Sequence, residues 1–224
     1  GGFRYVSPDE ARESLTGANT KKALVAVILD HKRKGMGSVG MYGAGIVTFA
    51  LNKLAKLGSA ERGPVGEDRR SFYAAANALF ARAHKLLGSL TPRGISSVLH
   101  SGAILSRNDT TLFVSLAKRA VSEGILGNFT TQGMSNLLWS FGKLGLRHNE
   151  STSAILQLCT YVDSQPPASN LSVANFNAMD IANCMSGLGS LGIDEDATPL
   201  IATLLEAANK PEMLTAFSEV LLSQ

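Results

Sequence analysis

The chain has 224 residues, and 45% of them are hydrophobic, which suffices for one large domain or two small ones. No apolar run approaches the ~20 residues needed to cross a bilayer, and the two cysteines, Cys159 and Cys184, are too few for a disulfide framework or a four-ligand zinc site. The net charge of +3 hides a split, because residues 1–148 hold 20 of the 21 basic residues but only nine of the 18 acidic ones. This asymmetry indicates one end facing a polyanion and the other facing water or a basic protein, with an unevenly charged solvated surface as the alternative.

The first predicted element is a helix at Lys21–Lys34, which we interpret as the second helix of an incomplete unit. It is followed by Gly35–Gly40, a literal Gly-x-Gly-x-x-Gly string. A dinucleotide-binding loop opens directly from a strand, whereas Asp30–Lys34 intervene here. A flexible glycine connector is therefore the simpler interpretation.

Four later segments resemble one another without gaps: Ile46–Gly58, Gly94–Ser106, Gly133–Gly145 and Asp180–Gly192. Their apolar residues recur at offsets that keep one helical face, as in the column Val47, Ile95, Met134 and Ile181. A column of small residues, at which a neighbouring helix could approach closely, holds Ala55, Ala103, Gly142 and Gly189. The last column suits a helix C-terminus, where glycine readily adopts positive φ, and holds Gly58, Ser106, Gly145 and Gly192.

A second apolar helix is predicted after each segment, at about Arg70–Leu87, Asp109–Glu123, Ser151–Asp163 and Ala197–Lys210. Asp109, Asn149 and Asp194 are candidate N-caps or first-turn acids. The base period is ~38–39 residues. Insertions rich in Gly, Pro or Ser, at Ser59–Asp68 and Ser164–Leu171, lengthen two of the intervals.

These patterns predict an all-α fold, an α-solenoid of about four helix-turn-helix repeats forming a single domain over residues 1–224. The predicted parts are a partial N-terminal unit at 1–40, repeats at 41–88, 89–127, 128–172 and 173–210, and a cap or further helix at 211–224. Stacked helix pairs share one core and leave a concave surface built from the first helix of each pair. That surface is where we expect the function to lie.

The segment Gln132–Leu146 resembles the core of octotricopeptide and heptatricopeptide repeats, which are similar to the repeats of FASTK-type and RAP-domain proteins. The match rests on Asn136, Trp139, Lys143, Leu144 and Gly145, and is weaker in the other units. The resemblance implies an organellar RNA-binding protein in the mitochondrial matrix, with the chloroplast as an alternative, whose transit peptide has been removed or is not part of this sequence. It implies a structural rRNA-binding component of a mitochondrial ribosome or a factor in RNA processing or translation. We find no RAP domain.

Candidate RNA contacts are side chains of three kinds, on the first helices or in basic clusters on and beside the second helices. Amides bond base edges, Trp and His stack on bases, and Lys and Arg neutralise phosphates. The candidates are Lys21, Lys22, Lys32, Arg33, Lys34, Lys53, Lys56, Arg69, Arg70, Arg93, His100, Lys118, Arg119, Asn136, Trp139, Lys143 and Arg147. Alternatively, Trp139 packs in the core, Asn136 bonds within the fold, and the basic clusters are solvated helix ends.

We expect no enzymatic activity, metal or cofactor, because the histidines and cysteines lack ligand spacing and no serine lies in a nucleophile elbow. The expected partners are RNA through the basic N-terminal units and proteins through the acidic C-terminal unit, without a membrane or a small-molecule substrate. The alternative function is a protein-interaction scaffold that uses the same concave surface.

Overall fold

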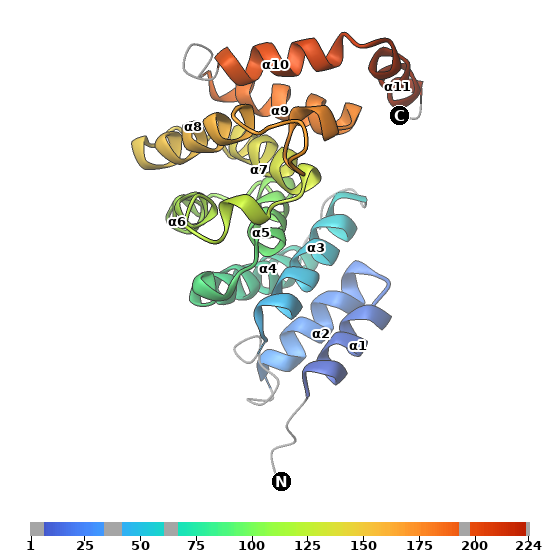
Figure 1. Cartoon of the computed structure of the whole chain (residues 1–224). Coiled ribbons are helices and arrows are strands. Elements are labelled where there is room, and N and C mark those ends of the chain that lie inside the picture. Colours follow the sequence, from blue (N-terminus) through green and yellow to red (C-terminus); the bar gives the residue numbers. More distant parts are fainter. Residues whose placement is uncertain (1–6, 34–41, 61–66, 193–197, 223–224) are drawn as a thin grey trace. The chain divides into compact units, whose positions relative to one another are not determined.

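The computed structural model describes residues 7–33, 42–60, 67–192 and 198–222. These residues form α-helices joined by short connections, with no β-strand among them, so the predicted all-α class is confirmed (Figure 1). No helix within these ranges is long and apolar enough to cross a membrane. The α-helices are α1 (Pro8–Gly17), α2 (Lys21–Arg33), α3 (Ala44–Ala60), α4 (Glu67–Lys85), α5 (Pro92–Ile104), α6 (Thr110–Ala120), α7 (Thr131–Leu144), α8 (Asn149–Asp163), α9 (Ala178–Leu191), α10 (Thr198–Ala208) and α11 (Pro211–Leu222).

The described residues divide into two compact units. Unit 1 comprises α1 to α4 with Ile104–Ser106, and unit 2 runs from Thr91 to the C-terminal side without those three residues. The predicted division into repeats within a single domain stays a prediction. The Gly-x-Gly-x-x-Gly string and the inner part of the first insertion lie outside the described residues.

Unit 1 begins with a helix that the sequence analysis missed. Ser7 and Glu10 form a reciprocal capping box, in which the Glu10 amide donates to Ser7 Oγ and the Ser7 amide donates to the Glu10 carboxylate. Pro8 occupies the first turn, so Ser-Pro-Asp-Glu is a helix start signal that could have located α1. Helices α2, α3 and α4 then pack against one another, with α1 against α2 and α3.

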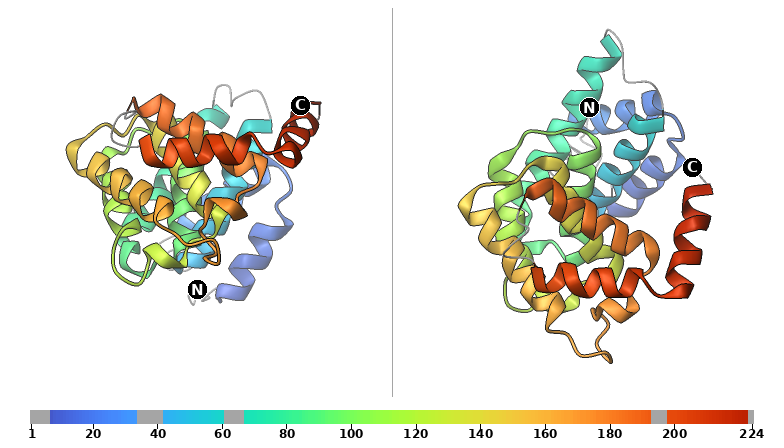
Figure 2. Two further views of the ribbon diagram at one scale, coloured as in Figure 1. Left: turned by 45° about the horizontal axis from the view of Figure 1, so that its top comes forward. Right: turned by 90° about the horizontal axis from the view of Figure 1, so that it is seen from above.

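Unit 2 is built in two layers. The Ser135 hydroxyl of α7 donates to Asp180 of α9, and α5 contacts α7 through the rings of His100 and Trp139. Helices α6, α8 and α10 follow one another on the other side, α6 against α8 and α8 against α10 (Figures 1 and 2). We call α5, α7 and α9, with α3 of unit 1, the A helices, since each carries one of the four similar segments.

Each A helix of unit 2 starts in the same way. A short 3-10 turn precedes it, then a buried apolar residue, then an N-cap whose side chain accepts an amide bond. The apolar residues are Leu90, Phe129 and Phe176, and the caps are Thr91, Thr130 and Asn177. In each case the fourth helical residue (Ile95, Met134 or Ile181) is buried as well, the arrangement of a hydrophobic staple.

The ends of the A helices confirm most of the predicted helix C-termini at Gly58, Ser106, Gly145 and Gly192. Gly145 and Gly192 have left-handed backbones with φ of 61° and 64°, and Ser106 has φ of 49° at the corresponding place. The prediction was wrong for Gly58, because α3 continues to Ala60. A Cβ at Gly58 would lie 2.7 Å from the Phe72 ring, so this glycine makes room for α4 within unit 1.

The small-residue column was predicted to mark places where a neighbouring helix approaches closely. This prediction is correct at Gly142 and wrong at Gly189. A Cβ on Gly142 would overlap the backbone of Gly187, and one on Gly187 would overlap the Leu138 carbonyl, whereas Gly189 has open space. Helices α7 and α9 therefore cross at Gly142 and Gly187. Of the residues predicted as N-caps or first-turn acids, Asp109 caps α6 by accepting the Leu112 amide, whereas Asn149 lies in the first turn of α8 and His148 is the cap residue. Asp194 lies outside the described residues.

Candidate nucleic-acid interface

Each A helix presents a row of side chains outside the core, and we use the term outer row for these positions on each helix taken by itself. On each helix the row has four positions, of which the first and last are exposed and the second is half-buried. The row consists of Gly45, Phe49, Asn52 and Lys56 on α3, Arg93, Ser97, His100 and Ile104 on α5, Gln132, Asn136, Trp139 and Lys143 on α7, and Met179, Asn183, Ser186 and Ser190 on α9. Three of the four positions thus share similar exposure on all the A helices, as the gapless alignment predicts, whereas the third is exposed on α3 and α9 and half-buried on α5 and α7.

Two ring side chains meet within this row. The His100 and Trp139 ring centroids lie 5.1 Å apart, with their planes inclined by 34°. Both residues are half-buried, and Nδ1 of the His100 ring is itself buried. Burial lowers the pKa of His100, and its Nδ1 has no hydrogen-bond partner among the described residues. At neutral pH this pair is therefore an uncharged aromatic platform.

The A helices expose no carboxylate. Their only acidic residue is Asp180, which is 2% exposed. Its side chain accepts bonds from the Ser135 hydroxyl and from the Asn177 amide, so it is committed to joining α7 and α9. A surface without exposed carboxylates offers no electrostatic barrier to a polyanion.

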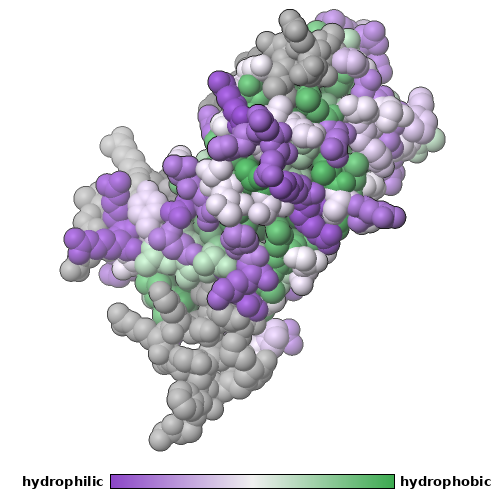
Figure 3. Space-filling view, turned by 90° about the vertical axis from the view of Figure 1, so that its left-hand side faces the viewer, coloured by the Kyte–Doolittle hydropathy of each residue, from purple (hydrophilic) through white to green (hydrophobic). Residues whose placement is uncertain are grey.

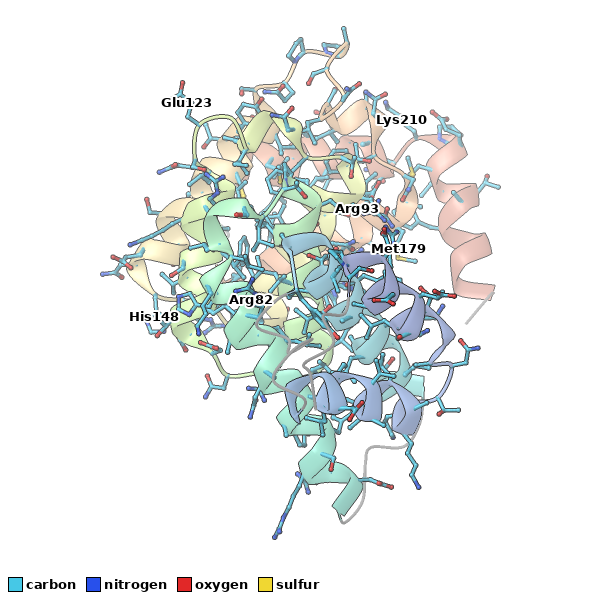
Figure 4. The ribbon with its side chains drawn as sticks, turned by 90° about the horizontal axis from the view of Figure 1, so that it is seen from below. Arg82, Arg93, Glu123, His148, Met179 and Lys210 are labelled. Atoms are coloured by element: carbon cyan, nitrogen blue, oxygen red, sulfur yellow. The ribbon has the colours of Figure 1, made fainter. Side chains whose placement is uncertain are left out.

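Two of the three basic residues of the outer row lie at helix ends. Arg93 is exposed in the first turn of α5, Lys143 is exposed in the last turn of α7, and Lys56 is exposed on α3. In Figure 4, Arg93 and Met179 lie on one side of unit 2, and Glu123 and His148 lie on the other. Figure 3 views the side on which α6 and α8 lie, where hydrophilic side chains are prominent.

Several predicted RNA contacts have partners within the protein. Lys53 Nζ donates to the Leu15 and Thr16 carbonyls at the end of α1, at 2.8 and 2.6 Å. Lys118 of α6 forms an ion pair with Glu150 of α8 at 2.8 Å. Each of these lysines thereby joins two helices.

Two predicted arginines are also engaged. Arg147 donates to the Ser190 carbonyl in the last turn of α9, at 2.8 Å, where a cation also complements the helix dipole. Arg119 is half-buried and donates to the Ser122 hydroxyl at 3.0 Å. These contacts leave Arg93, Lys143 and Lys56 as the predicted cations on the outer row.

The remaining basic candidates belong to unit 1, away from its A helix. Lys21 and Lys22 begin α2 and line a groove of about 720 Å³ with Asp30 and Asp68. Arg70 is exposed on α4, and Arg69 lies 5.8 Å from the centroid of the Tyr73 ring. Lys34 lies outside the described residues, as do the side chains of Lys32 and Arg33.

The sequence analysis did not select Gln132 or Met179 as surface residues of this site. Both are exposed and occupy the position of Arg93 on the next two A helices, 39 and then 47 residues further along. The same two shifts that align the core columns locate them. Extending the alignment one residue before each similar segment would have found both.

Metal ligands and thiols are the remaining reactive groups considered within the described residues. No group of three or more His, Cys, Asp and Glu side chains there could hold a metal ion. Burial raises the pKa of Cys159 to about 12 and raises that of Cys184 as well, so neither thiol is a nucleophile at neutral pH. No family model matches the sequence, and no curated protein matches it either.

Proposed function

We propose that this chain is an RNA-binding α-solenoid of about four helix-turn-helix repeats, in which the outer row contacts RNA. The observation that carries the proposal is the absence of exposed carboxylates on the four A helices, together with the aromatic pair at the surface of unit 2. RNA-binding surfaces combine cations for phosphates with ring side chains for bases. The chain acts by binding, without a catalytic step of its own.

Each class of side chain in the outer row has a distinct part in this proposal. Trp139 and His100 stack on an unpaired base, and the Asn136 amide bonds a base edge beside them. Arg93 and Lys143 take phosphates and so position the strand without reading its sequence. The residues with internal partners, namely Lys53, Lys118 and Arg147, hold the helices in place.

The resemblance of Gln132–Leu146 to octotricopeptide and heptatricopeptide repeats supports a place in organellar RNA metabolism. We propose the mitochondrial matrix, with the chloroplast as the alternative. The role there is that of a structural rRNA-binding component of the mitochondrial ribosome, or of a factor in RNA processing or translation. Co-sedimentation with ribosomal subunits, followed by crosslinking and sequencing of bound RNA, separates these roles.

The test of RNA binding is fluorescence anisotropy with a labelled single-stranded RNA, read between about 50 and about 200 mM salt. For single strands, the logarithm of the binding constant falls with that of the salt concentration by about 0.7 for each phosphate contact. Replacing both Arg93 and Lys143 by Gln should weaken binding and reduce this slope by about 1.4. The matched control is Lys118→Gln, which removes a cation from α6, in the other layer of unit 2.

Two results would contradict the proposal. One is a salt dependence of RNA binding that becomes weaker in Lys118→Gln and stays unchanged in the Arg93/Lys143 double variant. RNA would then lie on another surface. The other is binding to no RNA, coupled with specific binding of a protein to the outer row, which would favour the interaction scaffold.

A further inference from the structure

Helix α4 of unit 1 (Figure 1) is basic along nearly its whole length. Its first two residues are Glu67 and Asp68, and residues 69–85 then include three arginines, one lysine and one histidine but no acidic residue. Helices α8 and α10, by contrast, contain acidic residues and no basic ones. The positive charge is therefore a property of α4 and not of the second helices in general.

Five exposed residues of α4 lie on one face of the helix, and we call them the basic stripe: Arg70, Asn77, Ala81, His84 and Lys85. Counted from the first of them, the others lie seven, eleven, fourteen and fifteen residues further along, each close to a whole number of helical turns. The opposite face is buried in unit 1, where α4 packs against α2 and α3. The stripe thus belongs to a single surface of a single helix.

The cations of the basic stripe are not used within the described residues. Arg70 and Lys85 form neither an ion pair nor a side-chain hydrogen bond there, whereas Lys118 of α6 pairs with Glu150. Lys85 lies in the last turn of α4, where the helix dipole favours a cation. Arg70 lies in the first turn, where the dipole disfavours one. The stability of α4 therefore accounts for Lys85 and leaves Arg70 without a structural reason.

The spacing of these two cations suits a long and rigid partner. They lie about 22 Å apart along the helix axis, since an α-helix rises about 1.5 Å per residue. The exposed side chains between them are those of Asn77 and Ala81, which are short. A partner that lies along α4 can therefore reach both ends of the stripe without meeting a bulky side chain.

The chemistry of the stripe favours a nucleic-acid duplex over a membrane or a protein. The apolar side chains of α4, such as Phe72, Leu79 and Phe80, are buried, and none of the exposed large hydrophobic residues in the described part of the chain lies on this helix. A helix on a membrane embeds an apolar face, and a protein interface centres on apolar or aromatic anchors. Duplex RNA, in contrast, is recognised mostly by shape and through its phosphates and 2′-hydroxyls.

We propose that the basic stripe of α4 binds the phosphate backbone of double-stranded RNA. Arg70 and Lys85 each neutralise a phosphate, and the Asn77 amide donates to a backbone oxygen between them. The stripe is a different surface from the outer row, to which we assign unpaired bases. Only the choice of RNA over DNA rests on the proposed function.

The experiment uses the full chain and two labelled RNAs, namely a blunt duplex of about 16 base pairs and an unstructured single strand. Fluorescence anisotropy is read between about 50 and about 200 mM salt. Arg70→Gln/Lys85→Gln should weaken duplex binding and reduce the slope of its salt dependence by about 1.8, at about 0.9 for each phosphate contact on a duplex. The matched control is Arg12→Gln/Lys210→Gln, which removes the same charge from exposed residues outside both surfaces. Circular dichroism verifies that each variant keeps its helix content.

Four outcomes would overturn the proposal: no duplex binding, duplex binding that Arg70→Gln/Lys85→Gln leaves unchanged, an equal loss in the control, or tighter binding to a DNA duplex of the same sequence. Binding to vesicles of phosphatidylserine and phosphatidylcholine that this variant abolishes, without duplex binding, would assign the stripe to a membrane surface instead. Arg93→Gln/Lys143→Gln should weaken single-strand binding and leave duplex binding unchanged. Failure of the stripe is therefore distinct from failure of the outer row.

Discussion

The rings of His100 and Trp139 lie 5.1 Å apart although the residues are 39 positions apart in sequence, at the same place on α5 and α7. At this position of α5 and α7, the side chains of equivalent residues therefore contact each other. The aromatic pair gives the proposed function a direct optical probe.

Trp139 is the only tryptophan in the chain, so its emission reports on the outer row alone. We expect single-stranded RNA to quench this emission, because a base stacked on the indole changes its surroundings. Trp139→Ala should weaken binding by about 1–3 kcal/mol. Titration of the parent chain with unstructured RNA, followed by fluorescence and anisotropy together, checks both. Binding seen by anisotropy with unchanged emission would place the RNA away from Trp139.

The stability of the chain should carry a pH dependence from His100. Burial lowers the pKa of His100 in the folded chain, whereas the unfolded chain keeps the ordinary value of 6.5. Above both pKa values His100 is neutral in both states and contributes no pH dependence. As the pH falls below 6.5 the unfolded state binds this proton first, so the free energy of unfolding falls until the lower folded-state pKa is passed.

Urea unfolding of the parent chain and of His100→Gln between neutral and mildly acidic pH measures this effect. As the pH falls, the unfolding free energy of the parent chain should decrease more than that of His100→Gln. The parent and the variant differ only at position 100, so the comparison isolates this residue. A difference that stays constant over this range would mean that His100 titrates alike in the folded and unfolded chains.

The crossing of α7 and α9 should make two nearby glycines respond oppositely to alanine. Gly187→Ala places a methyl group against the Leu138 carbonyl, which should cost about 1–3 kcal/mol. Gly189→Ala meets open space on the same helix, and should stabilise by about 0.5–1 kcal/mol because alanine favours helix. Denaturant melts of the two variants make the comparison, and equal effects from both would argue against this crossing.

Two residues that follow A helices in the left-handed conformation, Ser106 and Gly145, should respond oppositely to substitution. Ser106→Gly should stabilise the chain by about 1 kcal/mol, because a residue with a Cβ is strained at φ of 49°. Gly145→Ala, at φ of 61°, should destabilise it by a similar amount. Thermal unfolding of both variants would show the opposite shifts, and a loss of stability for Ser106→Gly would mean that the serine side chain contributes more than its strain costs.

Much of this fold can be predicted from the sequence because burial on a helix follows local periodicity. The column Val47, Ile95, Met134 and Ile181 is buried throughout, and the predicted second helices correspond to α4, α6, α8 and α10. Gly145 and Gly192 were correctly predicted to mark helix ends, because glycine tolerates a positive φ wherever it occurs in the chain. Thr91, Thr130 and Asn177 could also have been found, since capping is equally local.

The partners of individual side chains could not be predicted in this way. Nothing near Lys53 in sequence indicates that its ammonium group bonds the end of α1, and nothing near Lys118 indicates Glu150. The same holds for Gly58 and Gly187, whose missing side chains make room for Phe72 and for the backbone of α7. Each such contact joins residues that are distant in the chain.

The sequence by itself determined most of the helical segments, the apolar face of each, and the common register of the similar segments on the A helices. The tertiary structure alone decided which cations remain on the outer row, where α7 and α9 cross, and that His100 meets Trp139. The physical reason is that helix formation and amphipathicity depend on neighbours within a few turns of the chain. Ion pairs, close helix crossings and ring contacts depend on distances between helices, which only packing sets.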